Sequence, residues 1–201
     1  MNDGASARKI YDESGCARYK FLTDFFFYPY GIRDFVFRRV EVRNGDRILD
    51  AGCGFGILSR ALHDKISGER LAGIEQHAFD ISEDMLQAFR ETGAEEITLQ
   101  RLDVRDLPYD DDCFDLIVSS AMLEYVPDMD EALASLKRCL KPGGKIYLFM
   151  SRKSPLNSFL FKPFGEPRSY SFKELAEVFS SAGFRDIRRR RFPLTSCWLN
   201  M

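Results

Sequence analysis

The sequence predicts an α/β fold built on a mostly parallel β-sheet. Short apolar stretches of strand length alternate with segments of helical periodicity between residues 46 and 151. Residues 114–120 form a nearly continuous apolar run, which is typical of a strand that is covered on both faces. Because parallel strands end at the same edge of a sheet, we expect a ligand crevice at their carboxyl ends.

Composition limits the class of protein. The 201 residues predict a single domain, and 29 basic against 31 acidic residues give no overall attraction to nucleic acid or anionic membranes. Five scattered cysteines without a C-x-x-C pair indicate a reducing compartment and no metal site. The first residues lack a secretory leader pattern, and no apolar run approaches the roughly 18 residues of a membrane span. We therefore expect a cytoplasmic protein without a transmembrane segment.

Four parts of the domain can be distinguished. Residues 1–45 are predicted to form an N-terminal helical cap, which Pro29 and Gly31 divide into two helical pieces. Residues 46–151 form the core. Residues 152–170 are a long, proline-containing apolar connection, either a substrate lid or a short amphipathic helix on the surface. Residues 171–201 are predicted to supply a C-terminal helix and closing strands.

The core begins with a strand, a glycine turn and a helix at residues 48–62. Three glycines at alternate positions follow an acid, in the order Asp50-Ala51-Gly52-Cys53-Gly54-Phe55-Gly56. Glycines allow main-chain N–H groups to approach a ligand closely, and the start of the helix offers further unpaired N–H groups. Ile57 stands where a dinucleotide fingerprint needs glycine, and no Gly-Lys-Ser/Thr follows, so NAD, FAD and ATP are disfavoured.

This stretch resembles the first motif of the class I S-adenosylmethionine-dependent methyltransferases. The resemblance implies a seven-stranded, mostly parallel, doubly wound sheet with an N-terminal helical cap. It also implies S-adenosyl-L-methionine as cofactor and S-adenosyl-L-homocysteine as product. A glycine-rich turn of another α/β protein is the alternative. The positions that the resemblance assigns to the cofactor in this motif are Asp50, Gly52, Cys53, Gly54 and Gly56.

A second acid is expected to bind the cofactor's ribose. Residues 79–86 resemble the family's second motif, and Ser82 is placed to cap a helix with two acids in its first turn. We therefore expect Asp80 to accept the ribose hydroxyls, with Ile81 beside the cofactor, which requires the preceding helix to be one to two turns longer than usual. Glu75, which the family's spacing favours, remains the alternative.

The adenine end of the site is predicted from the next two strands. Residues 97–103 are expected to form a strand, after which the resemblance places Asp103 against the adenine amino group and the Val104 main chain beside the ring. The alternative for Asp103 is a turn-capping role. Ser119, near the end of the strand at 114–120, is the last predicted cofactor contact.

The acceptor side is predicted from residues 121–128, which resemble the corresponding stretch of small-molecule methyltransferases. They lack the [Asn/Asp]-Pro-Pro-[Tyr/Phe] motif that methylation of DNA bases or of glutamine would require. We expect methyl transfer by in-line displacement to a small-molecule or lipid-like, partly hydrophobic acceptor, with no DNA partner. Glu124 and Tyr125 are the catalytic candidates if the acceptor must lose a proton.

The remaining elements follow from their caps. Asp128 is predicted to cap a helix that runs to residue 140, and a Lys-Pro-Gly-Gly turn separates it from a strand at 145–150. Ser171 is predicted to cap a further helix.

Residues 184–192 are predicted to form a strand whose five arginines protect an exposed sheet edge. The same arginines leave an RNA or protein methyltransferase as an alternative function. The other alternative function is a module that binds the cofactor without catalysing methyl transfer.

Overall fold

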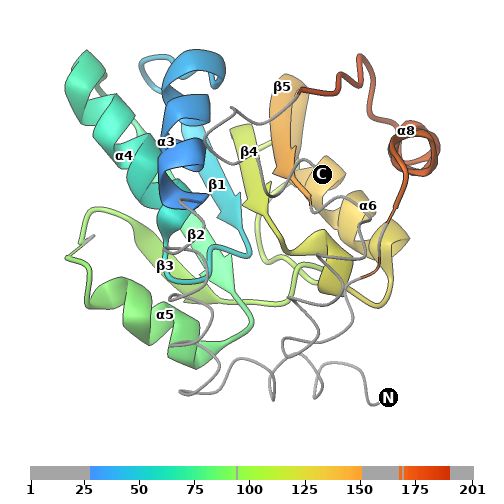
Figure 1. Ribbon diagram of the computed structural model, residues 1–201, viewed down its shortest axis with the longest axis horizontal. Helices are drawn as coiled ribbons and strands as arrows, with labels where there is room; N and C mark the ends of the chain where they lie inside the picture. The colour runs from blue at the N-terminus through green and yellow to red at the C-terminus, as the bar shows by residue number, and fades with distance from the viewer. Residues whose placement is uncertain (1–27, 94, 151–167, 169, 191–201) are drawn as a thin grey trace.

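The computed structural model describes residues 28–93, 95–150, 168 and 170–190. Its core is a sheet of parallel strands in the order β3-β2-β1-β4-β5 (Figure 1). The α/β fold is confirmed, and the described ranges contain five of the seven strands expected. The strands are β1 Arg47–Ala51, β2 Glu75–Asp80, β3 Thr98–Arg101, β4 Phe114–Ser120 and β5 Leu140–Phe149.

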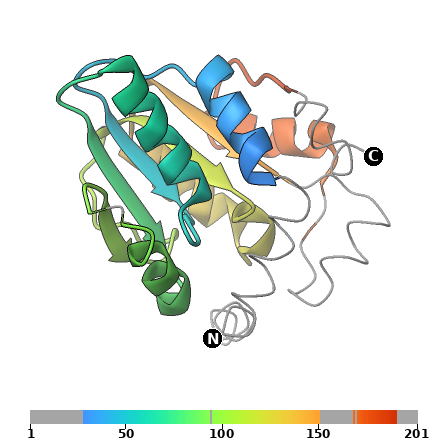
Figure 2. The same cartoon turned by 60° about the vertical axis from the view of Figure 1, so that its left-hand side comes forward.

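Helices cover both faces of the sheet, as a doubly wound fold requires (Figure 2). On one face α3 and α4 lie side by side over β1 and β4, and α5 packs against β2. On the other face α6 and α8 pack against the same sheet. The helices are α3 Tyr28–Arg39, α4 Ile57–Glu69, α5 Glu83–Arg90, α6 Met129–Cys139 and α8 Phe172–Ser181, with a 3-10 turn at Leu123–Tyr125.

Strand alternation in β1 divides the core and positions the first candidate acid. Ile48 packs with Leu62 on the α4 face, whereas Leu49 packs with Leu133 on the α6 face. Successive side chains of a strand point to opposite faces. Asp50 therefore shares the face of Ile48 and lies beneath the first turn of α4.

The predicted helix starts are confirmed by their caps. The Ser82 hydroxyl accepts a hydrogen bond from the main-chain N–H of Met85 at 3.3 Å, and Asp128 accepts one from Glu131 at 3.0 Å. Ser171 forms a complete capping box with Glu174. Each cap satisfies an N–H group that has no partner within its helix, and this fixes where the chain turns into helix.

Two helices differ in detail from the prediction. Pro29 and Gly31 both lie in the first turn of α3, where a missing N–H removes no helical hydrogen bond, and the segment before Tyr28 lies outside the described residues. α4 ends at Glu69 and closes on Arg70, whose φ of 56° is left-handed. α4 therefore extends one residue beyond Gly68, where the prediction ended it, and a loop at 70–74 separates it from β2.

β5 is longer than predicted. Leu140 already pairs with Phe114, and Lys145 pairs with Leu116, so residues 141–144 form an irregularity within one strand. Gly143 allows this because its φ is 78°. The predicted Lys-Pro-Gly-Gly turn is thus an interruption of β5 rather than a connection before it.

The predicted C-terminal strand is not present in the part of it that the structure describes. Residues 184–190 form no strand, and Asp186 has a φ of 55°, which interrupts an extended run. The Arg189 guanidinium lies 6.0 Å from the ring centre of Phe172. The rest of this segment lies outside the described residues, as does the predicted lid at 152–170 apart from residues 168 and 170. Among the helices of the described ranges, none has the length and apolar character to cross a bilayer.

Candidate cofactor-binding site

A cavity opens where β1, β2 and β4 end, at the edge that the fold class predicts. Polar groups converge on it from the glycine turn and from the ends of β1 and β2, and apolar side chains form much of the remaining wall. Its lining residues are Asp50, Gly52, Cys53, Gly54, Phe55, Ile57, Leu58, Phe79, Asp80, Ile81, Met85, Leu102, Asp103, Val104, Arg105, Ser120, Ala121, Met122, Tyr125, Val126 and Pro127.

The first two glycines of the turn expose main chain to the cavity. Gly52 and Gly54 have φ values of 71° and 52°, a region that side chains with a Cβ rarely adopt. A Cβ at Gly54 would meet no atom of the described residues within 4 Å, so its main chain is open to a ligand. A Cβ at Gly52 would lie 2.6 Å from the Cβ of Met122, which packs directly on this glycine.

Gly56, which the resemblance assigns to the cofactor, packs against a helix. It lies outside the cavity lining and precedes α4 with a φ of 86°. A Cβ at this position would lie 2.4 Å from the Phe89 ring of α5. The third glycine of the motif therefore allows α5 to pack closely against the turn.

Asp50 is a buried carboxylate at the wall of the cavity, with an exposed fraction of only 2%. The Ser59 hydroxyl donates a hydrogen bond to its Oδ2 at 2.6 Å, while its Oδ1 has no donor among the described residues. Burial raises the pKa of Asp50 to about 7, against the opposing effect of the Ser59 hydrogen bonds. Such a group can accept a further N–H donor from a ligand.

Asp80 lines the cavity from the carboxyl end of β2. Its Oδ2 accepts a hydrogen bond from the Gly54 N–H at 2.8 Å, and its Oδ1 accepts one from the Ser82 N–H at 2.9 Å. Burial raises the pKa of Asp80, and the same main-chain donors act against this rise. Asp80 thus links the glycine turn to the start of α5, directly beside the cavity. Glu75, the alternative, lies at the other end of β2.

Asp103 and Val104 line the cavity after β3. The guanidinium of Arg105 binds the Asp103 carboxylate through Nε at 3.0 Å and Nη2 at 2.7 Å. The bidentate pair orients the carboxylate at the rim. Val104 is buried, with 5% exposure.

Two of the predicted residues lie behind the cavity wall. Ser119 is buried, and its hydroxyl donates to the Ala51 carbonyl at 2.7 Å, which ties β4 to β1. The next residue, Ser120, lines the cavity instead, because successive side chains of a strand alternate. Glu124 is 2% exposed and outside the lining, whereas its neighbour Tyr125 is part of it.

Sequence reasoning missed most of the apolar wall. Met122 is the clearest case, since it covers Gly52 and lines the cavity. It is turned there by Ala121, whose φ of 52° is rare for a residue with a Cβ and is fixed by a hydrogen bond to the Phe149 carbonyl at 2.9 Å. No sequence signal marks an alanine in this conformation, so Met122 could not have been chosen in advance.

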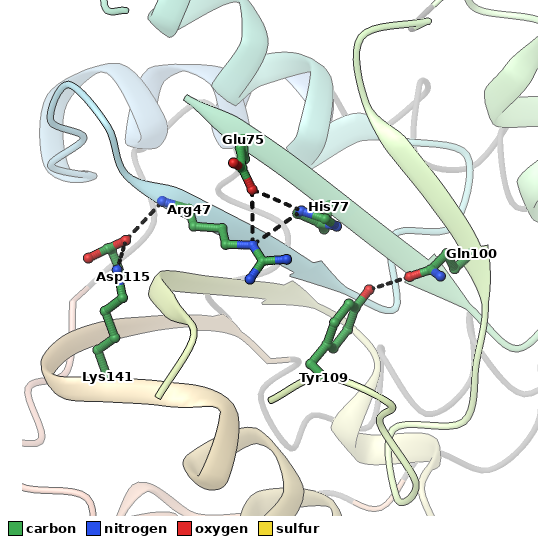
Figure 3. A network of polar contacts seen from close by, with 7 residues as sticks. All are labelled: Arg47, Glu75, His77, Gln100, Tyr109, Asp115 and Lys141. Atoms are coloured by element: carbon green, nitrogen blue, oxygen red, sulfur yellow. Dashed lines mark hydrogen bonds and ion pairs between the residues drawn. The ribbon is translucent and has the colours of Figure 1, made fainter. Parts of the chain in front are cut away.

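The opposite end of the sheet carries a separate network of charges (Figure 3). Arg47 Nε lies 3.1 Å from Glu75 and 3.4 Å from the His77 Nε2, and its main-chain N–H donates to Asp115 at 2.9 Å. Lys141 binds the same Asp115 carboxylate at 2.7 Å. Glu75 therefore pairs with Arg47 at the amino end of β2, and it is not among the residues that line the cavity.

Known proteins are similar to this chain in sequence and in fold. A family model described as a methyltransferase domain matches residues 49–148. The demethylmenaquinone methyltransferase of Staphylococcus aureus (strain JH9) is 30% identical over 187 residues, which cover 78% of this chain and 75% of that relative. Phosphoethanolamine N-methyltransferase 2 of Caenorhabditis elegans is 27% identical over 156 residues, which cover 74% of this chain but only 34% of that protein. The chain thus spans about a third of the second relative's length.

Solved structures also resemble this chain in fold. A chain in the complex between the Haloferax volcanii Trm112 methyltransferase activator and a methyltransferase has a TM-score of 0.69 and 28% identity. The match covers 83% of this chain and 72% of that one. Together with the glycine turn and the cavity at the strand ends, these matches show that the chain belongs to the class I S-adenosylmethionine-dependent methyltransferases.

Proposed function

We propose that the chain transfers a methyl group from S-adenosyl-L-methionine to a small, partly hydrophobic acceptor by in-line displacement, leaving S-adenosyl-L-homocysteine. One observation carries this proposal. Two carboxylates, the buried Asp50 and the half-buried Asp80, and the open main chain of Gly54 all border a single cavity at the strand ends.

The residues present fit the cofactor in chemical type. Asp80 can accept hydrogen bonds from ribose hydroxyls, and the free oxygen of Asp50 can accept one from an ammonium group. Asp103, Val104, Ile81 and Cys53 also line the cavity, and we assign Asp103 and Val104 to the adenine end. The cofactor supplies an electrophilic methyl group on a sulfonium, so the protein has mainly to position the reactants and exclude water, which is worth up to roughly 7 to 11 kcal/mol.

The acceptor is proposed to bind against the wall after β4. Met122, Tyr125, Val126 and Pro127 give this side an apolar surface with one phenol. The two named relatives carry the names of enzymes for a demethylmenaquinone and for phosphoethanolamine, which are small molecules. Of the two base candidates, Tyr125 is the one that reaches the cavity, and Glu124 lies behind it.

The wider assignments are part of the same proposal. We assign all 201 residues to one domain, with residues 152–170 as a lid on the acceptor side, and we place the protein in the cytoplasm on the evidence of its cysteine content. Exposed arginines in residues 185–190 are the only support for an RNA acceptor. Figure 1 shows this stretch near the start of β5, at the other end of the sheet from the cavity.

The proposal is tested by offering methyl-labelled S-adenosylmethionine with separated small-molecule, lipid, RNA and protein fractions. We expect label in the small-molecule or lipid fraction, and none with Asp80→Ala. Label that enters RNA or protein alone would overturn the acceptor class. Tight cofactor binding without label in any fraction would favour a binding module.

A further inference from the structure

Ser59 holds the candidate ammonium-binding acid in one orientation. It lies in the first turn of α4, is 1% exposed, and donates its hydroxyl hydrogen to Asp50 Oδ2 at 2.6 Å. The Gln76 side chain donates to the Ser59 carbonyl at 3.4 Å, so this turn of α4 is also held by β2. A serine hydroxyl has one hydrogen to donate, which leaves Asp50 Oδ1 without a donor among the described residues.

The surroundings of Asp50 contain no compensating charge within the described part of the chain. The Cys53 thiol on the glycine turn and Asp80 on β2 are the titratable groups that face it, and Val118 of β4 lies beside it in the sheet. No ion pair joins Asp50 to a lysine, arginine or histidine of the described ranges. A buried carboxylate in such a place is costly unless a donor or a cation reaches it.

We propose that Ser59 is a positioning residue for the cofactor: by occupying Asp50 Oδ2 it leaves Oδ1, a buried oxygen without a donor among the described residues, to receive the ammonium group of the methionine moiety. This inference rests on the proposed function. It adds a residue that the glycine motif does not include and that does not itself line the cavity.

A second consequence concerns protonation. Burial raises the pKa of Asp50 to about 7, and hydrogen bonds from Ser59 act against this rise. Removing the hydroxyl takes away that opposing effect, so the carboxyl stays protonated to higher pH. A protonated Asp50 attracts an ammonium group less than the carboxylate does. The cofactor affinity of a Ser59→Ala variant should therefore be weakest, relative to the natural protein, near and below neutral pH.

The test is a calorimetric titration of the full chain with S-adenosylmethionine at pH 6, 7 and 8.5. The ligand's own amino group titrates near about pH 8, so the ratio of dissociation constants at each pH is compared. We expect Ser59→Ala to weaken binding by about tenfold at pH 7. The ratio should shrink at pH 8.5, with the pH dependence moved up by about one pH unit.

Controls separate positioning from damage to the fold. Ser135→Ala removes another buried serine hydroxyl, on α6 and outside the cavity, and should leave binding at the natural level. Ser59→Thr keeps a hydroxyl and should restore binding. In an Asp50→Asn background, Ser59→Ala should have little further effect, because its action passes through the Asp50 carboxylate.

The outcomes are distinguishable. An equal loss at every pH, or a full loss that persists in the Asp50→Asn background, would overturn the role of Ser59. Natural binding by Ser59→Ala at all three pH values would overturn it as well. If the natural protein itself fails to bind the cofactor at any pH, the proposed function fails instead.

Discussion

The acidic side chains at the two ends of the sheet have different partners, and their pKa values are shifted in opposite directions. At the carboxyl end Asp50 and Asp80 are held by a hydroxyl and by main-chain N–H groups, and burial raises the pKa of both. At the amino end burial also acts to raise the pKa of Asp115, but Lys141 and the Arg47 N–H outweigh it, so its pKa lies below the usual value. The acids at the amino end are thus paired with cations, whereas Asp50 and Asp80 at the carboxyl end form no ion pair within the described residues.

This difference in partners indicates which end of the sheet binds a ligand. Glu75 and Asp115, at the amino end and away from the cavity, are paired with cations (Figure 3). Acids left without a cation in a cavity are costly in the free protein, and their cost is recovered when a ligand supplies donors. On this view the two ends of β2, Glu75 and Asp80, have different functions although they lie in one strand.

The largest expected effect is a loss of cofactor affinity when the acid at the carboxyl end of β2 is replaced, and not when the acid at its amino end is replaced. Asp80→Ala removes the carboxylate that we propose accepts the ribose hydroxyls, together with the hydrogen bond from Gly54, so affinity for S-adenosylmethionine should fall by about 100-fold or more. Glu75→Ala is the matched control and should change affinity by less than about twofold. Equal losses in the two variants, measured by calorimetry, would erase the distinction between the two ends.

A smaller effect is expected where the glycine turn meets Met122. Gly52→Ala would place a Cβ 2.6 Å from the Met122 Cβ at a φ of 71°, so the turn must move and cofactor affinity should fall by about tenfold. Gly143→Ala, in the irregular part of β5, has a similar φ of 78° but no neighbouring atom within 4 Å. It should cost only about 1 kcal/mol in the free energy of unfolding and leave affinity intact. If both variants bind the cofactor alike, Met122 does not define the site.

The two ends should also respond to pH with opposite sign. The folded pKa of Asp50 is above its unfolded value, so its contribution to stability is full below about pH 4 and is lost as pH rises toward about 7. The folded pKa of Asp115 is below its unfolded value, so its contribution is present above about pH 4 and is lost in acid.

Urea unfolding of the cofactor-free protein measures this difference. At pH 8, Asp50→Asn should raise the free energy of unfolding by about 2 kcal/mol. Asp115→Asn should lower it by about 1 kcal/mol, with the difference from the natural protein disappearing below about pH 4. A destabilised Asp50→Asn variant at pH 8 would contradict the assignment of Asp50 as an uncompensated acid.

The smallest expected effect is at the arginines after α8. Replacing Arg188 and Arg190 with serine should leave both cofactor affinity and small-molecule methylation unchanged, since both side chains are exposed and neither lines the cavity. Salt-dependent RNA binding that disappears in this double variant would instead support an RNA acceptor.

Much of the fold could be predicted because local chemistry determines it. The apolar run of β4, the caps at Ser82, Asp128 and Ser171, and the strand end at Asp80 all depend on nearby residues. The interruption in β5 could not be predicted in this way, because pairing with β4 decides it.

The site was predictable in part for the same reason. The glycine turn and the acids after the strands lie in short motifs, and most of these residues reach the cavity. The motif does not specify which of two adjacent strand residues faces the cavity, and Ser120, rather than the predicted Ser119, is among the lining residues. Gly56 differs in that its constraint comes from Phe89, which lies 33 residues later in the chain.

The central claim is that the uncompensated acids and the glycine turn form a binding site for an adenosyl cofactor. Its most direct test is a set of parallel calorimetric titrations of the full chain with S-adenosylmethionine, S-adenosylhomocysteine and NAD. We predict one-to-one binding of the first two compounds and no binding of NAD. Binding of NAD, or no binding of any of the three by protein that unfolds cooperatively, would contradict the account.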